Sequence, residues 1–248
     1  MEISMKGRRL VVAGGSRGIG RAIALAFARA GASVSICARG RDGVEDALAE
    51  LRTHGVGVHG AACDLADGDA VRRYVADAAQ ALGGIDVLVN NASGFGRTDD
   101  EAGWAVSISV DLLASVRASQ AALAHMPDGG SIIHVSSISG LTPSVRTPPY
   151  GAVKAAMIQY TKTQAATLAA RRIRVNCVAP GSIEFPGGVW DKARTANPEL
   201  YSRILDGIPF GRFGNPDEVA SVVLFLASDL ASWVTGQTIA IDGAQMLV

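Results

Sequence analysis

Short apolar runs alternate with longer helical segments along the whole chain, and this alternation limits the possible folds more than any other feature. Seven runs are expected to form strands: RLVVAG (9–14), SVSICA (33–38), GVHGAAC (57–63), IDVLVN (85–90), SIIHVSS (131–137), RVNCVAP (174–180) and QTIAIDG (237–243). Most are continuously apolar, which is typical of a parallel sheet buried on both faces. Helices are expected near 18–30, 42–53, 67–82, 100–125, 150–170 and 215–227. This order predicts an α/β fold with one doubly wound, mostly parallel sheet and helices on both faces.

One segment, near residues 182–214, departs from this regular order. It reads SIEFPGGVWDKARTANPELYSRILDGIPFGRFG and carries Phe185 and Trp190 between glycines. Long irregular connections in compact domains are usually functional, often as lids. We therefore predict a substrate lid here. No linker rich in Pro, Gly or Ser divides the chain, so residues 1–248 are expected to form one domain that includes the lid.

Composition excludes several classes of function. Lys plus Arg and Asp plus Glu both number 23, so no overall charge attracts nucleic acid or an anionic membrane. The basic start is followed by only four apolar residues before Gly14, too few for a signal peptide, and no apolar run is long enough for a membrane span. Three cysteines without pair spacing indicate buried thiols, and four histidines without ligand spacing indicate packing rather than a metal site. We expect a cytoplasmic protein.

A glycine-rich turn follows the first predicted strand. In AGGSRGIGRAIALAF, Gly14, Gly18 and Gly20 have the spacing G-x-x-x-G-x-G, and a helix begins within the motif. Glycines let the backbone turn tightly and approach a pyrophosphate, whose charge is stabilised by the N–H groups and dipole at the helix start. The pattern predicts a dinucleotide-binding turn, although its spacing differs from G-x-G-x-x-G.

Two arginines indicate which dinucleotide is bound. NAD sites usually place an acid at the end of the second strand to hold the ribose hydroxyls. Here that position is Arg39, and Arg17 lies inside the glycine turn. Guanidinium groups pair well with a 2′-phosphate. NADP(H) is therefore predicted, with NAD as the less favoured alternative.

A possible catalytic group follows the fifth strand. Ser136 and Ser137 end that strand, and Tyr150 and Lys154 lie four residues apart on the next helix, hence on one face. In a doubly wound sheet, ligands bind at the carboxyl ends of the strands, where these residues emerge. A phenol is a poor acid–base catalyst at neutral pH, but a nearby ammonium favours its ionised form. Lys154 is placed to supply that charge.

With these motifs the chain resembles a short-chain dehydrogenase/reductase of the single-domain, Rossmann-type kind. The resemblance is carried in order by GGSRGIG, CDL (63–65), NNAS (90–93), the serine strand, YGAVK, VAPGSI (178–183) and ASWVTGQTIAIDGA. It covers essentially the whole chain, and among family members it looks most similar to 3-oxoacyl-thioester reductases. It implies that Tyr150 is the proton donor or acceptor, that Lys154 holds the nicotinamide ribose, and that Ser137 orients the substrate. Ser137 is preferred because the family's serine lies thirteen residues before the tyrosine.

The resemblance also implies the cofactor contacts. Asp64 and Leu65 would contact adenine, Asn91 and Ala92 the adenosine ribose, and Ile183 the carboxamide. Together with the turn and the arginines, the expected cofactor-binding residues are Gly14, Ser16, Arg17, Gly18, Ile19, Gly20, Arg39, Asp64, Leu65, Asn91, Ala92, Tyr150, Lys154, Pro180, Gly181 and Ile183. Ala-rich surfaces near 103–125 and 150–169 resemble the family's dimer-forming helices, so a homodimer or homotetramer is expected.

Three positions depart from the family pattern. Ala13 stands where a threonine is common, and Phe185 stands where PGxIxT usually supplies a threonine for the cofactor. Asp111, in ISVDLLAS, replaces the asparagine that serves the family's proton relay. An anion near Lys154 would raise the pKa of the lysine. We therefore expect Asp111 to take part in catalysis, to preserve the relay and to move the pH optimum upward.

The residues favour an enzyme that interconverts a small-molecule ketone and a secondary alcohol. Predicted substrate contacts are Ser137, Phe95, Thr142, Val145, Phe185 and Trp190. The apolar lid residues favour a hydrophobic or cyclic ketone, or a 3-oxoacyl thioester. Two alternatives stay open: an NAD-dependent alcohol, sugar or steroid dehydrogenase of the same family, and a non-catalytic NADP-binding sensor.

Overall fold

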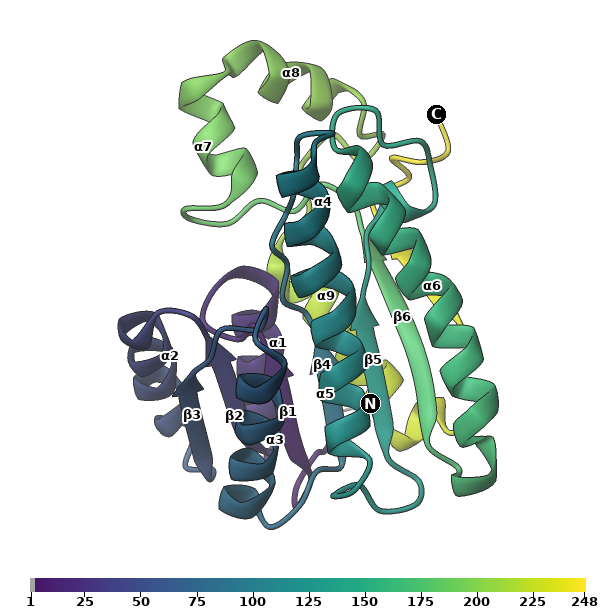
Figure 1. Ribbon diagram of the computed structural model, residues 1–248. Coiled ribbons are helices and arrows are strands. Elements are labelled where there is room, and N and C mark those ends of the chain that lie inside the picture. The colour runs from purple at the N-terminus through teal and green to yellow at the C-terminus, as the bar shows by residue number, and fades with distance from the viewer. Residues whose placement is uncertain (1–2) are drawn as a thin grey trace.

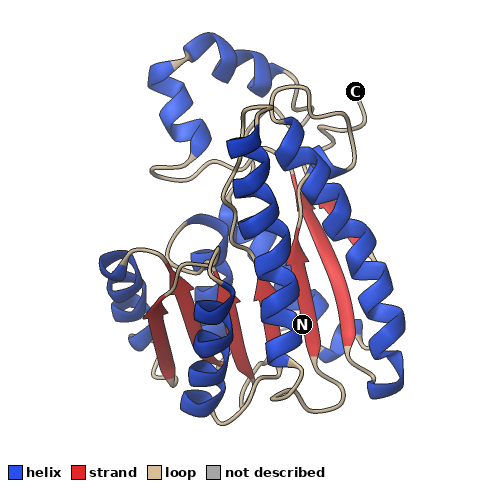
Figure 2. Cartoon of the chain, in the orientation of Figure 1, coloured by secondary structure: helices blue, strands red, loops and turns tan. Residues whose placement is uncertain are grey.

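The computed structural model describes residues 3–248, whose seven strands form one parallel sheet with helices on both faces (Figures 1 and 2). The strands are β1 (Arg9–Ala13), β2 (Ser33–Ala38), β3 (Val58–Ala62), β4 (Val87–Asn90), β5 (Ser131–Val135), β6 (Arg174–Pro180) and β7 (Thr238–Ile241). They lie in the order β3-β2-β1-β4-β5-β6-β7. The order reverses between β1 and β4, which is where a doubly wound sheet binds its ligands. The predicted fold class is confirmed.

Burial on both faces of the sheet explains the continuous apolar runs. Leu10 and Val12 of β1 point into one core, whereas Val11 and Ala13 point into the other, and all four are at most 5% exposed. The edge strand β3 is only partly buried, which accounts for its weaker apolar pattern. The strand pattern therefore follows from the two layers of helices.

The helices divide into these two layers. The helices are α1 (Gly18–Arg29), α2 (Arg41–Arg52), α3 (Gly68–Leu82), α4 (Glu101–Val106), α5 (Ala114–Ala122), α6 (Pro148–Leu168), α7 (Val189–Ala196), α8 (Pro198–Asp206) and α9 (Pro216–Ala227). A π-helix, η1 (Ser107–Leu113), joins α4 to α5, and short 3₁₀ turns are η2 (Ile138–Gly140), η3 (Ala169–Arg171) and η4 (Asp229–Ala231). The core of one face is built with α1, α2 and α9, and that of the other with α3, α5 and α6.

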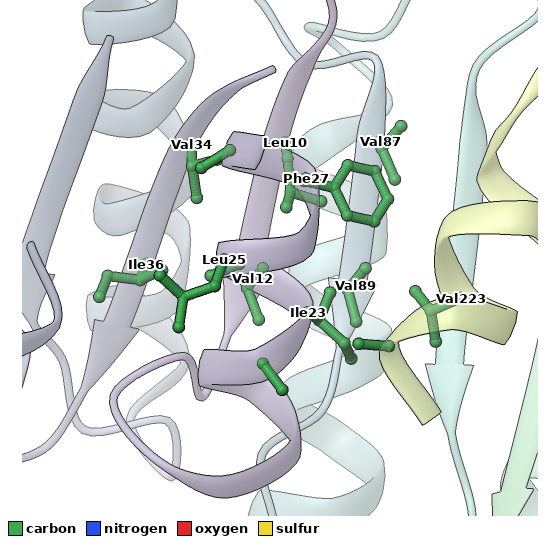
Figure 3. Packing of buried hydrophobic residues seen from close by; sticks show 14 of the residues in the cluster. Leu10, Val12, Ile23, Leu25, Phe27, Val34, Ile36, Val87, Val89 and Val223 are labelled. Carbon is green, nitrogen blue, oxygen red and sulfur yellow. The ribbon is translucent and has the colours of Figure 1, made fainter. Parts of the chain in front are cut away.

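The core beneath α1 fixes the glycine-rich turn against the sheet. Figure 3 shows Ile23 and Phe27 of α1 packed among residues of β1 and β4 and close to Val223 of α9. Both side chains are fully buried. Each contributes roughly 2–3 kcal/mol to folding relative to an exposed side chain. The turn that precedes α1 therefore rests on a rigid base.

The segment near 182–214 is not irregular, and in this respect the sequence prediction was wrong. It contains α7 and α8, which project from the body of the molecule (Figure 1). Asn197 caps α8 by accepting from Leu200 N–H at 3.1 Å, and Pro198 occupies the first turn. The two ends of the segment are tied together where Ile183 pairs with Gly214. The segment is thus a pair of helices that meet at an angle, and its two ends are paired (Figure 1).

The long helix expected near 100–125 is also not uniform. Residues 101–122 remain helical, but the wider π-turns of η1 interrupt them. Such π-segments are frequent at functional sites. Among the described residues, no helix combines the length and apolar character needed to cross a membrane, and no cluster of three or more acidic, His or Cys side chains could hold a metal ion. The three cysteines are free and buried.

Candidate active site

The predicted catalytic side chains meet at the carboxyl end of β5. Tyr150 lies in the first turn of α6, and Lys154 follows one turn later with its Nζ 5.4 Å from the Tyr150 ring centroid. Pro148 and Pro149 open α6 in a position where the missing proline N–H groups leave no intrahelical bond unmade. The start of the helix therefore fixes both side chains on one face.

Lys154 is held in a buried position by two oxygen atoms. The side chain is 3% exposed, and Nζ donates to the backbone oxygen of Val135 at 3.0 Å. Asp111 Oδ1 lies 3.1 Å from Nζ, and the Asp111 side chain is fully buried. Burial acts to lower the pKa of Lys154, but the charges of Asp111 and then Tyr150 outweigh it, so the pKa lies above its usual value. This is the direction that the sequence analysis expected from an anion at position 111.

Asp111 itself is fixed by the π-helix and by the loop after β4. Its Oδ2 accepts the N–H of Gly94 at 3.0 Å, and its backbone oxygen accepts the hydroxyl of Ser115 at 3.2 Å. The other oxygen, Oδ1, has no aligned hydrogen-bond donor in residues 3–248, so its contact with Lys154 is mainly electrostatic. The carboxylate is thus in direct contact with the ammonium of Lys154.

The two serines after β5 have different surroundings. Ser136 is buried and donates to the backbone oxygen of Lys154 at 2.8 Å, so it ties β5 to α6. Ser137 accepts the N–H of Ser139 at 3.1 Å, and its hydroxyl proton remains free to donate to a ligand. This arrangement favours Ser137 as the serine that meets substrate, as the sequence predicted.

His134, two residues before Ser136, is a core residue. Its ring is fully buried, with Nε2 3.0 Å from Gln164 Oε1 and Nδ1 3.2 Å from Asn90 Nδ2. Burial lowers its pKa to about 4, so the ring is neutral at pH 7. The prediction that the histidines serve in packing holds for this residue.

Phe95 stands beside Tyr150. Its ring lies edge-on to that of Tyr150, with centroids 4.9 Å apart and an interplanar angle of 80°. The guanidinium of Arg97 lies 5.6 Å from the Phe95 ring centroid. Phe95 therefore packs against Tyr150, and as a substrate contact it stays a prediction.

The glycine-rich turn fits a dinucleotide pyrophosphate. A Cβ on Gly20 would lie 2.0 Å from the backbone oxygen of Gly14, so no larger residue fits there without a shift of the backbone. Asn91 Nδ2 donates to the same oxygen at 2.6 Å, and Ala92 packs against Gly14. The turn is thus anchored to the loop after β4, and it leads directly into the N-terminus of α1, which suits a phosphate.

The residues predicted to read the adenosine half follow β1, β2 and β3. Arg17 and Arg39 are exposed, and neither forms an ion pair with any residue in the range 3–248. Asp64 accepts the N–H of Ala66 at 3.0 Å, and Leu65 is buried. Ser16 and Ile19 lie in the turn itself and are partly buried. These positions are compatible with an adenosine 2′-phosphate.

The expected contacts after β6 lie at the root of the lid. Pro180 ends β6, Gly181 packs against Asp242, and Ile183 is buried at 7% exposure. Phe185 lies against Gly18, where a Cβ would come within 2.6 Å of the ring. The chain thus joins the start of the segment 182–214 to the glycine-rich turn.

The remaining predicted substrate contacts are not brought beside Tyr150. Trp190 stacks on Phe213 with centroids 5.4 Å apart, inside the lid. Thr142 and Val145 line an open hollow of about 590 Å³ whose lining includes neither Ser137 nor Tyr150. As substrate contacts these three residues stay predictions.

Sequence reasoning missed three groups that shape the site. The backbone oxygen of Val135 and the N–H of Gly94 hold Lys154 and Asp111, and no side-chain pattern marks backbone groups. Arg97 was also missed, although its position two residues after Phe95 offered a signal.

Comparisons with known proteins agree with this geometry. A family model described as Enoyl-(Acyl carrier protein) reductase matches residues 13–244. The 3-oxoacyl-(acyl-carrier-protein) reductase FabG of Aquifex aeolicus is 36% identical over 253 residues, covering 98% of this chain and 99% of its own. A short-chain dehydrogenase/reductase from Serratia marcescens superposes with a TM-score of 0.90 at 32% identity, covering 96% and 98% of the two chains. A short chain dehydrogenase from Burkholderia cenocepacia in complex with NADP gives a TM-score of 0.90 at 32% identity, with 98% and 99% covered.

Proposed function

The chain belongs to the short-chain dehydrogenase/reductase family, whose members are oxidoreductases acting on CH–OH groups, and we propose that it interconverts a ketone and a secondary alcohol with NADP(H). One observation carries the proposal. Lys154 is buried between Val135 and Asp111 and lies one turn from Tyr150, with the hydroxyl of Ser137 free to donate. A buried ammonium beside a phenol suits proton transfer to or from a carbonyl oxygen.

Each residue then has a distinct role in the reduction. When bound, the nicotinamide supplies a hydride to the carbonyl carbon. Ser137 donates a hydrogen bond to the carbonyl oxygen, and Tyr150 transfers its phenolic proton to that oxygen as negative charge develops. The ammonium of Lys154, 5.4 Å from the ring centroid, stabilises the charge left on the phenol. In the oxidation the proton moves in the opposite direction.

Asp111 serves the proton transfer through Lys154. The lysine has three donor positions, and the backbone oxygen of Val135 takes one of them, whereas the contact with Asp111 is mainly electrostatic. A further donor position is left to hold the nicotinamide ribose. Asp111 keeps the lysine charged and provides a buried acceptor next to it. We therefore assign Asp111 as the positioning residue of a proton relay.

Arg17 and Arg39 support NADP(H) rather than NAD. Both arginines lie beyond the carboxyl ends of β1 and β2 and have no carboxylate partner within residues 3–248. A free guanidinium at this place attracts a 2′-phosphate, whereas an NAD site would need an acid. The Burkholderia cenocepacia relative, whose structure contains NADP, supports the same choice.

The substrate is proposed to be an apolar or cyclic ketone, or a 3-oxoacyl thioester as the name of the Aquifex aeolicus relative suggests. Leu200 and Ile204 of α8 are partly exposed on one face of that helix and give the lid an apolar surface. We further propose that residues 1–248 act as one domain, in the cytoplasm, as a homodimer or homotetramer.

A substitution of the phenol tests the function. Purified Tyr150→Phe is expected to lose at least about 100-fold in kcat with NADPH and a panel of ketones, because general acid–base catalysis contributes that much. Binding of NADPH, followed by its fluorescence, should change little. Tyr160→Phe is the matched control, since Tyr160 lies on the same helix but contacts Gln164.

The same panel separates the alternatives. Ketone reduction by the wild type that survives in Tyr150→Phe would refute the role of the phenol. Binding of NADPH without turnover of any ketone or alcohol would favour a sensor. Turnover with NAD(H) at higher kcat/KM than with NADP(H) would favour an NAD-dependent dehydrogenase.

A further inference from the structure

The guanidinium of an arginine lies over the ring that contacts Tyr150. The guanidinium of Arg97 lies 5.6 Å from the Phe95 ring centroid, and that ring lies edge-on to Tyr150 at 4.9 Å between centroids. The guanidinium carbon of Arg97 therefore lies at most about 10.5 Å from the Tyr150 ring centroid. A planar guanidinium that rests on a ring keeps its N–H groups directed outward in the plane.

The loop that carries these side chains is firmly held. Gly94 donates to Asp111 at 3.0 Å, and a Cβ on Gly96 would lie 2.0 Å from the backbone oxygen of Gly103. Phe95 lies between the two glycines with a φ of +50°, which an aromatic residue rarely adopts. Such a conformation persists only where the surroundings impose it, and it is common at ligand sites. The position of Arg97 is therefore set by the loop.

The charge of Arg97 is available to a ligand. The side chain is exposed, and within residues 3–248 no carboxylate oxygen lies within 4.0 Å of its nitrogens. Two nearby acids have other partners. Asp99 accepts the indole N–H of Trp104 at 2.9 Å, and Asp100 caps α4 through the N–H of Gly103 at 2.8 Å.

We propose that Arg97 recognises an anionic group on the substrate, a carboxylate or a similar oxyanion, a few bonds from the reacting carbonyl. The proposal rests on the proposed ketone reduction, because it places the carbonyl at Tyr150. A guanidinium pairs with a carboxylate through two parallel N–H···O bonds. Arg97 and the apolar lid together define a substrate with an apolar body and one anionic end, which is a short-chain oxo acid or its hydroxy acid.

Matched pairs of ketones test the proposal. The probes are 4-oxopentanoate and 5-oxohexanoate, each compared with its methyl ester, which keeps the carbonyl and removes the charge. The measured quantity is kcat/KM with NADPH for the acid divided by that for the ester. The proteins are the wild type, Arg97→Ala, Arg97→Lys and the control Arg29→Ala, which removes an exposed charge at the far end of α1.

The wild type is expected to favour the acid, and Arg97→Ala to lower the acid-to-ester ratio about 10-fold, as for a lost charged hydrogen bond. Arg97→Lys should recover part of the acid-to-ester ratio, because lysine restores the positive charge but not the planar guanidinium. Arg29→Ala should leave the ratio unchanged. A ratio that is the same in Arg97→Ala and the wild type would overturn the proposal while leaving the ketone reductase intact.

Failure of the proposed function gives a different result. If the wild type reduces neither member of a pair, binding of the acid to the NADP-loaded protein is measured by calorimetry. Binding that weakens in Arg97→Ala but not in Arg29→Ala supports anion recognition by Arg97. Equal binding in all three proteins, or none in any, overturns it.

Discussion

Replacing Asp111 with asparagine removes one negative charge that lies 3.1 Å from the ammonium of Lys154, in a fully buried position. The change is nearly isosteric, and the N–H of Gly94 can still donate to the remaining oxygen. Lys154 now has burial acting on it without the opposing carboxylate, so its pKa should fall. The optimum of the pH–rate profile should move downward.

The structure sets the size of the shift. The 3.1 Å contact and the 5.4 Å distance from Nζ to the Tyr150 ring centroid place the carboxylate oxygen at most about 8.5 Å from that ring. At this separation the carboxylate of Asp111 and the negative charge that forms on the Tyr150 phenol repel each other by about 2 kcal/mol, with an effective dielectric constant of 20. Since 1.36 kcal/mol corresponds to one pH unit, the acidic limb of the oxidation profile should move down by about 1.4 units or more.

The assay is kcat/KM for alcohol oxidation with NADP between pH 5 and 10, for the wild type and Asp111→Asn. Asp46→Asn, which removes an exposed acid on α2, is the control for net charge. Breaking a buried pair costs about 3–5 kcal/mol, so the folded fraction is checked by circular dichroism at each pH. Superimposable profiles for the folded enzymes would refute the argument.

Three further predictions follow from the geometry. Arg39→Asp should shift the ratio of kcat/KM for NADPH over NADH by roughly 10- to 100-fold toward NADH, as for a lost charged hydrogen bond, and an unchanged ratio would remove Arg39 from cofactor choice. Ser137→Ala should lower kcat, whereas Ser136→Ala should mainly lower the unfolding free energy by about 1–2 kcal/mol, because only Ser136 is bonded to the backbone oxygen of Lys154; urea titration with initial rates separates them. His134 has a pKa of about 4 when folded, so the unfolded state binds more protons below pH 6.5 and the folded state loses stability as the pH falls from 6.5 to 4. His134→Gln should flatten the dependence of Tm on pH in that window, and an equally steep curve would show that another group causes it.

The sheet could be predicted because burial on both faces makes each central strand continuously apolar in sequence. A strand such as β1, with both faces covered by helices, has to be apolar at Leu10, Val11 and Val12 alike, and local sequence shows this directly. The lid helices could have been predicted too. Asn197, Pro198 and Glu199 form a normal helix start, which the glycines on either side obscured.

The parts of the site that were not predicted depend on contacts between distant segments. The family resemblance predicted an anion near Lys154, but the 3.1 Å ion pair joins residues 43 positions apart, and its distance depends on how η1 packs against α6. Likewise, Arg97 lies over the ring of Phe95 while Phe95 has a positive φ, which no propensity of phenylalanine favours.

The π-helix that carries Asp111 has a consequence for how such a site can change during evolution. A π-turn holds one residue more than an α-turn. Deletion of a single residue within Ser107–Leu113 would convert the π-turn into an α-turn. The helices α4 and α5 would still present the same sides to the sheet. Asp111 would then rotate away from Lys154. The buried charge can therefore be gained or lost by an insertion or deletion of one residue, and relatives that differ in length at this point should differ in pH optimum even where the acid itself is retained.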